Sequence, residues 1–139
     1  FVDPMPTYYN RTFGSQALPY WNPDNYAPDI IIIALGTNDY STLPHPSDEE
    51  FQSGYAKFLL QVQRDYPHAK ILCLCEPATS GNEEINVQKS ALHGGAEYLR
   101  IPDTIYDYGY GCDGHPNYNG QKAIAEAVIP KIRQMLIGT

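Results

Sequence analysis

Apolar positions are most concentrated in one short stretch of this chain. Residues 30–35 form an unbroken, mostly β-branched apolar run that ends at Gly36. Such a run is typical of a parallel strand that is covered on both faces. The pattern therefore predicts a central strand, with a neighbouring strand on each side.

Helical and strand patterns then alternate to the end of the chain. Ser47 and Glu50 fit a capping box, and the apolar side chains that follow recur at helical spacing until Pro67. Pro130 is expected to kink or split the last helix. The expected elements are a helix between Ser47 and Pro67, a strand over 70–75, a helix between Asn82 and Gly94, a strand over 96–101, a loop over 102–117 and a helix from Tyr118.

This order predicts an α/β fold with a parallel sheet and helices on both faces. The whole chain, 1–139, is expected to belong to one domain. Three strands are few for such a sheet. We therefore expect further strands of the sheet to precede Phe1.

The first 28 residues are rich in Pro and Tyr and predict a long ordered loop. Trp21 and the nearby tyrosines can either line a substrate subsite or pack this loop. Tyr108 and Tyr110, near the other end of the chain, are further candidates for contact with a substrate.

Composition excludes several classes of partner. Hydrophobic residues make up 42% and charged residues 18% of the chain, and the net charge is −7. These values fit a soluble globular protein and argue against nucleic acid or an anionic membrane as a partner.

The chain has three cysteines, Cys73, Cys75 and Cys112, so at least one thiol is unpaired within the chain. We expect Cys73 and Cys75 to be buried on one face of a strand. Neither a metal site nor a cofactor is predicted, because further ligands are not evident near the cysteines.

Two polar clusters follow predicted strands, where active sites of α/β sheets lie. In the first, Gly36 allows a sharp turn, the Asn38 amide can donate to a developing oxyanion, and Asp39 is expected to brace the loop. In the second, His115 can act as a general base with Asp113 as its partner. Taken alone, each cluster also fits an ordinary polar turn.

Together the two clusters resemble the SGNH (GDSL-like) hydrolase superfamily. Gly36, Asn38 and Asp39 match its third sequence block, and Asp113 and His115 match its fifth. The Asp-x-His spacing, preceded by Cys112 and followed by Pro116, is similar to carbohydrate esterase family 2, as is the Met-Pro…Arg-Thr segment over residues 5–12. The resemblance implies a flavodoxin-like, three-layer sandwich around a parallel sheet, of which this chain carries the C-terminal part.

The resemblance also implies a function. A secreted, extracellular enzyme of this family removes acetyl groups from polysaccharides such as xylan or mannan, without a cofactor, using a serine nucleophile, a His base and an Asn in the oxyanion hole. Gly114 departs from the family, in which an aromatic residue often separates the Asp and the His. The Gly-Asp-Ser block that carries the serine is also absent, so we expect an upstream segment or a second chain to supply it. Two alternatives remain open: an SGNH esterase or lipase acting on other acyl esters, and a non-catalytic carbohydrate-binding fragment.

Overall fold

The computed structural model describes residues 4–77 and 81–137. Three strands form one parallel sheet in the order β1-β2-β3. The register pairs Ile30 with Lys70 and Leu72 with Glu97. The strands are β1 (Ile30–Ala34), β2 (Lys70–Cys75) and β3 (Glu97–Arg100). All three lie within the ranges that the sequence predicts.

Helices and short 3-10 turns connect the strands. The capping box before α3 is present, because Ser47 Oγ accepts from the Glu50 backbone N–H (3.3 Å) and Glu50 Oε2 accepts from the Ser47 backbone N–H (2.9 Å). The helices are α1 (Met5–Tyr8), α2 (Thr37–Tyr40), α3 (Asp48–Asp65), α4 (Gly81–His93) and α5 (Tyr118–Ile137). The 3-10 turns are η1 (Pro23–Asn25), η2 (Asp103–Tyr108) and η3 (Cys112–Gly114).

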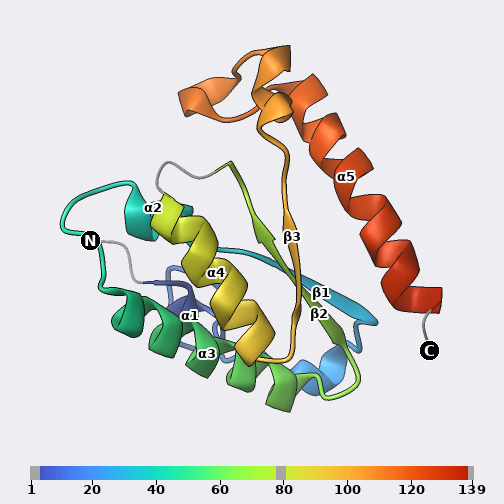
Figure 1. Cartoon of the computed structure of the whole chain (residues 1–139). Helices are drawn as coiled ribbons and strands as arrows, with labels where there is room; N and C mark the ends of the chain where they lie inside the picture. Colours follow the sequence, from blue (N-terminus) through green and yellow to red (C-terminus); the bar gives the residue numbers. More distant parts are fainter. Residues whose placement is uncertain (1–3, 78–80, 138–139) are drawn as a thin grey trace.

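The sheet has a separate core on each face. Because side chains alternate along a strand, Cys73 and Cys75 of β2 face α3 and α4, whereas Leu72 and Leu74 face α5. Figure 1 shows α5 on one side of the sheet and α3 and α4 on the other. This arrangement confirms the predicted three-layer α/β sandwich and the burial of the two cysteines on one face.

β1 lies at the edge of the sheet. Among the described residues it pairs with β2 alone. Ile33 points into the core beneath α3 and is 6% exposed, whereas Ile32 points to the other face and is 44% exposed. The β-branched run predicts a strand with two neighbours, and the structure leaves one of those two positions open.

α5 continues as one helix through Pro130. Of the two expected outcomes, a kink or a split, the split therefore does not occur. Pro130 cannot donate to the carbonyl of Glu126, but both residues lie on the exposed side of the helix, where water can bind that carbonyl.

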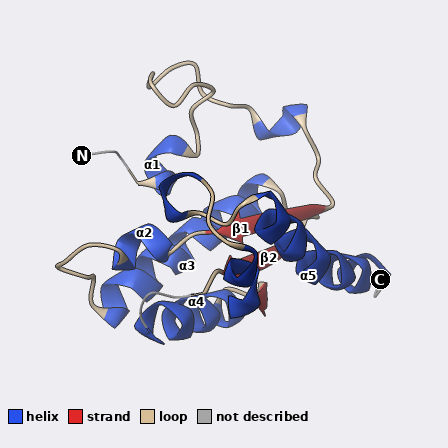
Figure 2. Cartoon of the chain, turned by 90° about the horizontal axis from the view of Figure 1, so that it is seen from above, coloured by secondary structure: helices blue, strands red, loops and turns tan. Residues whose placement is uncertain are grey.

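The N-terminal segment is an ordered loop, as predicted. The Trp21 backbone N–H donates to the Asn10 carbonyl (2.9 Å), and the ring of Tyr9 packs edge-on against Phe58 of α3 (5.2 Å between centroids). Figure 2 shows the segment looping out on the β1 side of the sheet. Within the described part of the chain, every helix is too short or too polar to cross a membrane.

Candidate active site

The two polar clusters meet at one pocket at the carboxyl ends of β1 and β2. The pocket has a volume of about 200 Å³. It is lined by Ala34, Leu35, Thr37, Asn38, Leu74, Glu76 and His115. The structure therefore brings Asn38 and His115 together although they are 77 positions apart in the sequence.

The Asn38 turn is held by the packing of Gly36. Gly36 has φ of +131°, a conformation that side-chain-bearing residues rarely adopt. A Cβ at this position would lie 3.0 Å from Val87 Cγ2 and 3.4 Å from Phe51 Cζ. Glycine thus allows the end of β1 to approach α3 and α4 closely, as the sequence predicts.

Buried polar groups of α4 fix the residues on both sides of Asn38. The Thr37 hydroxyl donates to Glu83 Oε1 (2.8 Å), and Asn86 Nδ2 donates to the Tyr40 hydroxyl (2.8 Å). Glu83 is 1% exposed and Asn86 is fully buried. Because such bonds are costly to break in a dry interior, the turn presents Asn38 from a rigid support.

Asp39 takes part in this turn through its backbone. Its backbone N–H donates to the Gly36 carbonyl (3.0 Å), but within the described residues its carboxylate bonds to no other segment. Burial raises the pKa of Asp39, and a hydrogen bond from its own backbone N–H partly offsets the rise. Thr37 and Tyr40, which the sequence analysis does not single out, connect the turn to α4 through their side chains.

A tight loop presents His115 to the pocket. The Gly111 N–H donates to the His115 carbonyl (2.7 Å), and the His115 N–H donates to the Cys112 carbonyl (3.1 Å). Asp113 and Gly114 have φ of +55° and +75°. In the described part of the chain, no hydrogen bond joins the Asp113 carboxylate to the His115 ring, so the structure does not display the Asp–His pairing expected from the sequence.

Residues at the start of α5 contact the loop that carries His115. Asn117 Oδ1 accepts from the Gly120 N–H (3.0 Å) and caps the helix, while Asn117 Nδ2 donates to the Tyr108 carbonyl at the end of η2. A Cβ at Gly120 would lie 2.8 Å from the Ile105 carbonyl oxygen and 2.8 Å from Pro116 Cβ. The helix therefore lies directly against the residue that follows His115.

The sequence model of the GDSL-like Lipase/Acylhydrolase family matches residues 7–123, which include both polar clusters. The chain belongs to this family. The cellulase/esterase CelE of Acetivibrio thermocellus is 29% identical to it over an alignment of 133 positions, which covers 86% of this chain and 16% of CelE. An acetylxylan esterase / glucomannan deacetylase of Cellvibrio japonicus is 26% identical and is matched over 95% of this chain and 38% of its own length.

Solved structures agree with this assignment. A family two carbohydrate esterase from Clostridium thermocellum in complex with cellohexaose superposes with a TM-score of 0.85 at 25% identity, over 94% of this chain and 42% of the other. A family 2 enzyme with a carbohydrate-binding domain from Corynascus thermopiles gives a TM-score of 0.81 at 25% identity, over 95% and 45%. This chain thus spans less than half the length of each of these two relatives and of each of these two solved structures.

Glu76 is a pocket residue that the sequence reasoning missed. Because Glu76 directly follows β2, the rule that active sites form at the carboxyl ends of parallel strands already places it beside Asn38. The sequence signal that could have identified Glu76 is a polar residue directly after a buried strand.

The aromatic candidates lie at opposite ends of the molecule. Tyr108 and Tyr110 are 54% and 68% exposed beside the His115 loop, and Tyr110 packs against Tyr106 with centroids 5.3 Å apart. Trp21 Nε1 instead donates to the Tyr66 hydroxyl (2.9 Å), just before β2 begins. Trp21 therefore lies at the amino end of the sheet, away from the pocket, where it packs the long loop.

The three cysteines are all free thiols. Burial raises the pKa of Cys73 and of Cys75 to about 11, whereas Cys112 is exposed next to the His115 loop. Within the described residues, no group of three or more His, Cys, Asp or Glu side chains is arranged to hold a metal ion.

Proposed function

We propose that this chain is the C-terminal part of the catalytic domain of a serine esterase that removes O-acetyl groups from polysaccharides of the xylan or mannan type. The observation that carries the proposal is the shared pocket of Asn38 and His115 at the carboxyl ends of the strands. Relatives named as acetylxylan esterase / glucomannan deacetylase support the substrate class. Because the substrate is a polymer outside the cell, we propose an extracellular location.

His115 and Asn38 take the two roles that acyl transfer needs. His115 removes the proton from a serine hydroxyl as its oxygen attacks the acetyl carbonyl, and Asn38 donates to the oxyanion that forms. His115 then returns the proton to the sugar oxygen as the sugar leaves. Water, activated by His115 in the same way, releases acetate from the serine.

The nucleophilic serine is proposed to come from outside this chain. Among the described residues, no serine lines the pocket. The open edge of β1, with Ile32 44% exposed, offers a position for a strand that would bring such a serine next to Asn38. That strand belongs either to an upstream segment or to a second chain.

A serine-reactive phosphonate tests this mechanism in the protein that contains the chain and its serine-bearing part. We expect the phosphonate to label that part, and the variant His115→Ala to abolish the labelling. His68→Ala is the control, because His68 is exposed in the turn before β2, at the opposite end of the sheet. Labelling that persists without His115 would contradict the proposal.

The absence of a serine from the pocket favours one other function, a non-catalytic carbohydrate-binding fragment. Turnover of 4-nitrophenyl acetate that depends on His115 would exclude it. An esterase for lipids or other acyl esters is separated by the acyl-length profile, because a preference for chains longer than acetyl would favour that alternative.

A further inference from the structure

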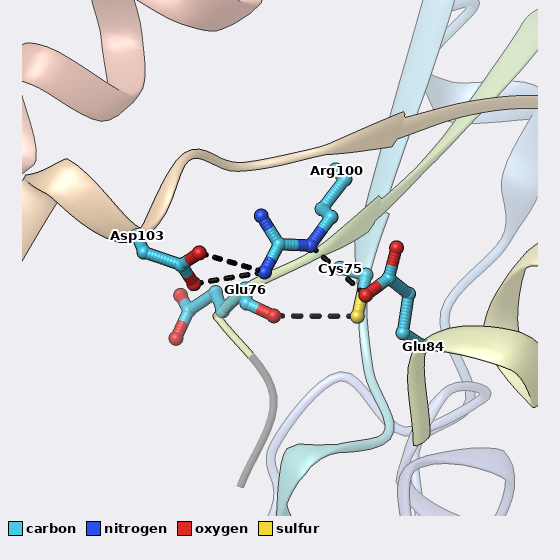
Figure 3. Close-up of polar contacts among 5 residues, drawn as sticks. All are labelled: Cys75, Glu76, Glu84, Arg100 and Asp103. Carbon is cyan, nitrogen blue, oxygen red and sulfur yellow. Dashed lines mark hydrogen bonds and ion pairs between the residues drawn. The ribbon is translucent and has the colours of Figure 1, made fainter. Parts of the chain in front are cut away.

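The carboxylate of Glu76 is free to contact a ligand in the pocket. The Glu76 backbone carbonyl accepts from Cys75 Sγ (3.3 Å), and Figure 3 shows its side chain pointing away from that sulfur. Among the described residues, no side chain or backbone N–H donates to the carboxylate. The residue is half-buried and lines the same pocket as Asn38 and His115.

The neighbouring cation does not neutralise Glu76. Arg100 Nε donates to Glu84 Oε2 (2.9 Å), and Arg100 Nη2 donates to both carboxylate oxygens of Asp103 (2.8 and 3.0 Å). Figure 3 shows Glu76 beside this cluster with its carboxylate outside the hydrogen bonds. Two acids already engage the guanidinium, so the charge of Glu76 remains available.

The negative charge of Glu76 also affects a tyrosine, Tyr106. Burial raises the pKa of Tyr106, and the negative charge of Glu76 raises it further. Tyr106 in turn packs against the exposed Tyr110. The charge of Glu76, a residue of the Asn38–His115 pocket, thus affects one of a pair of packed aromatic rings.

We propose that Glu76 is a specificity-determining residue that accepts a hydrogen bond from a hydroxyl of the sugar that carries the acetyl group. The inference rests on the function proposed above. The half-buried carboxylate keeps free acceptor positions that face the pocket, and a ligand hydroxyl can donate to them. Neutral sugars supply hydroxyl donors close to the ester, whereas a fatty acyl chain supplies none and an anionic substrate would be repelled.

A second role for this carboxylate would be to orient or stabilise protonated His115 directly. The two roles differ in their substrate dependence. A partner of His115 acts on every ester that the enzyme hydrolyses, whereas a sugar contact acts only on esters that carry the hydroxyl. The ratio of two specificity constants therefore separates them.

The test compares Glu76→Gln with the parent in the complete protein that includes the serine-bearing part. The measurement is kcat/KM for an acetylated xylo-oligosaccharide divided by kcat/KM for 4-nitrophenyl acetate. We expect the variant to lower this ratio by roughly 3- to 10-fold, because Gln keeps an acceptor oxygen but loses the charge that makes such a bond about twice as strong. Asp107→Asn removes the same charge from an exposed site on η2 that lies outside the pocket lining, and it should leave the ratio unchanged.

The outcomes separate the two proposals. If the parent shows no His115-dependent turnover of 4-nitrophenyl acetate, the proposed function is wrong. The proposed role of Glu76, which depends on that function, is then wrong as well. If the parent hydrolyses both substrates and Glu76→Gln leaves the ratio within twofold, only the inference on Glu76 is overturned. An equal loss on both substrates also overturns it, and would make Glu76 a partner of His115. Glu76→Asp, which keeps the charge but shortens the side chain, should lower the ratio less than Glu76→Gln does.

Discussion

Replacing Gly120 with alanine is the most direct test of how α5 positions His115. The new Cβ would lie 2.8 Å from the Ile105 carbonyl oxygen and 2.8 Å from Pro116 Cβ. Carbon atoms that are not bonded settle at about 3.5–4.0 Å. The Pro116 ring must therefore move by about 0.7 Å, or the helix must shift away from it.

Two opposing terms set the effect on stability. Overpacking of this kind costs about 1–3 kcal/mol, while alanine gains at most about 1 kcal/mol over glycine in a helix. We therefore expect the free energy of unfolding to fall by about 1–2 kcal/mol. Because His115 is bonded directly to Pro116, and a 1 Å misplacement can cost about 100-fold in rate, the proposed esterase activity of the complete protein, with its serine-bearing part, should fall by about tenfold.

Denaturant unfolding and 4-nitrophenyl acetate turnover measure the two effects. Gly54→Ala provides the matched control, because Gly54 lies within α3 and a Cβ there would meet nothing within 4 Å. We expect the control to gain about 0.5–1 kcal/mol. If Gly120→Ala were as stable and as active as the parent, the close packing of α5 against Pro116 would not position His115, and the reasoning would be refuted.

Four further predictions concern the start of α5, the Gly36 turn and the cysteines. Asn117→Ala should lower the unfolding temperature more than Asn117→Asp does, because Asp keeps the helix cap and loses only the bond to the Tyr108 carbonyl. Both variants should lower activity. Equal unfolding temperatures of the two variants would contradict the capping role. Gly36→Ala should cost about 1–3 kcal/mol in denaturant unfolding, because φ is +131° and its Cβ would lie 3.0 Å from a valine methyl; no loss would mean that this turn adapts freely. A thiol reagent at pH 8 should label Cys112 in the folded protein and reach Cys73 and Cys75 only on unfolding. Because burial raises the pKa of Cys73 and Cys75 from 9.0 to about 11, the unfolded state loses these protons first, so stability should fall as pH rises from 9 towards 11.

The sequence was sufficient for most of the fold because its signals are local. The apolar run over 30–35, the capping box at Ser47 and the apolar spacing up to Pro67 each depend on residues within a few turns of one another. Alternation along β2 also assigned Cys73 and Cys75 to one face, and the structure places both in the core beneath α3 and α4. Pro130 was the exception, because its effect depends on which side of α5 faces water.

The site was predicted only in part. Asn38 and His115 were found because each lies in a recognisable polar cluster, and the structure brings both to one pocket. Glu76 was missed because a single charged residue after a strand becomes a signal only when the strand-end rule is applied to it. Trp21 was a candidate on residue type alone, and its bond to Tyr66 takes it to the other end of the sheet.

The sequence by itself therefore determined the order of strands and helices, the parallel sheet and the two residues that the proposed chemistry needs. Only the tertiary structure decided which side chains share the pocket, that Glu83 and Asn86 support the Asn38 turn, and that Asp113 makes no bond to His115 within the described residues. The physical reason is the range of each interaction. Strand and helix patterns arise from neighbours along the chain, whereas the pocket is built from residues up to 81 positions apart that meet only when the sheet and α5 pack together.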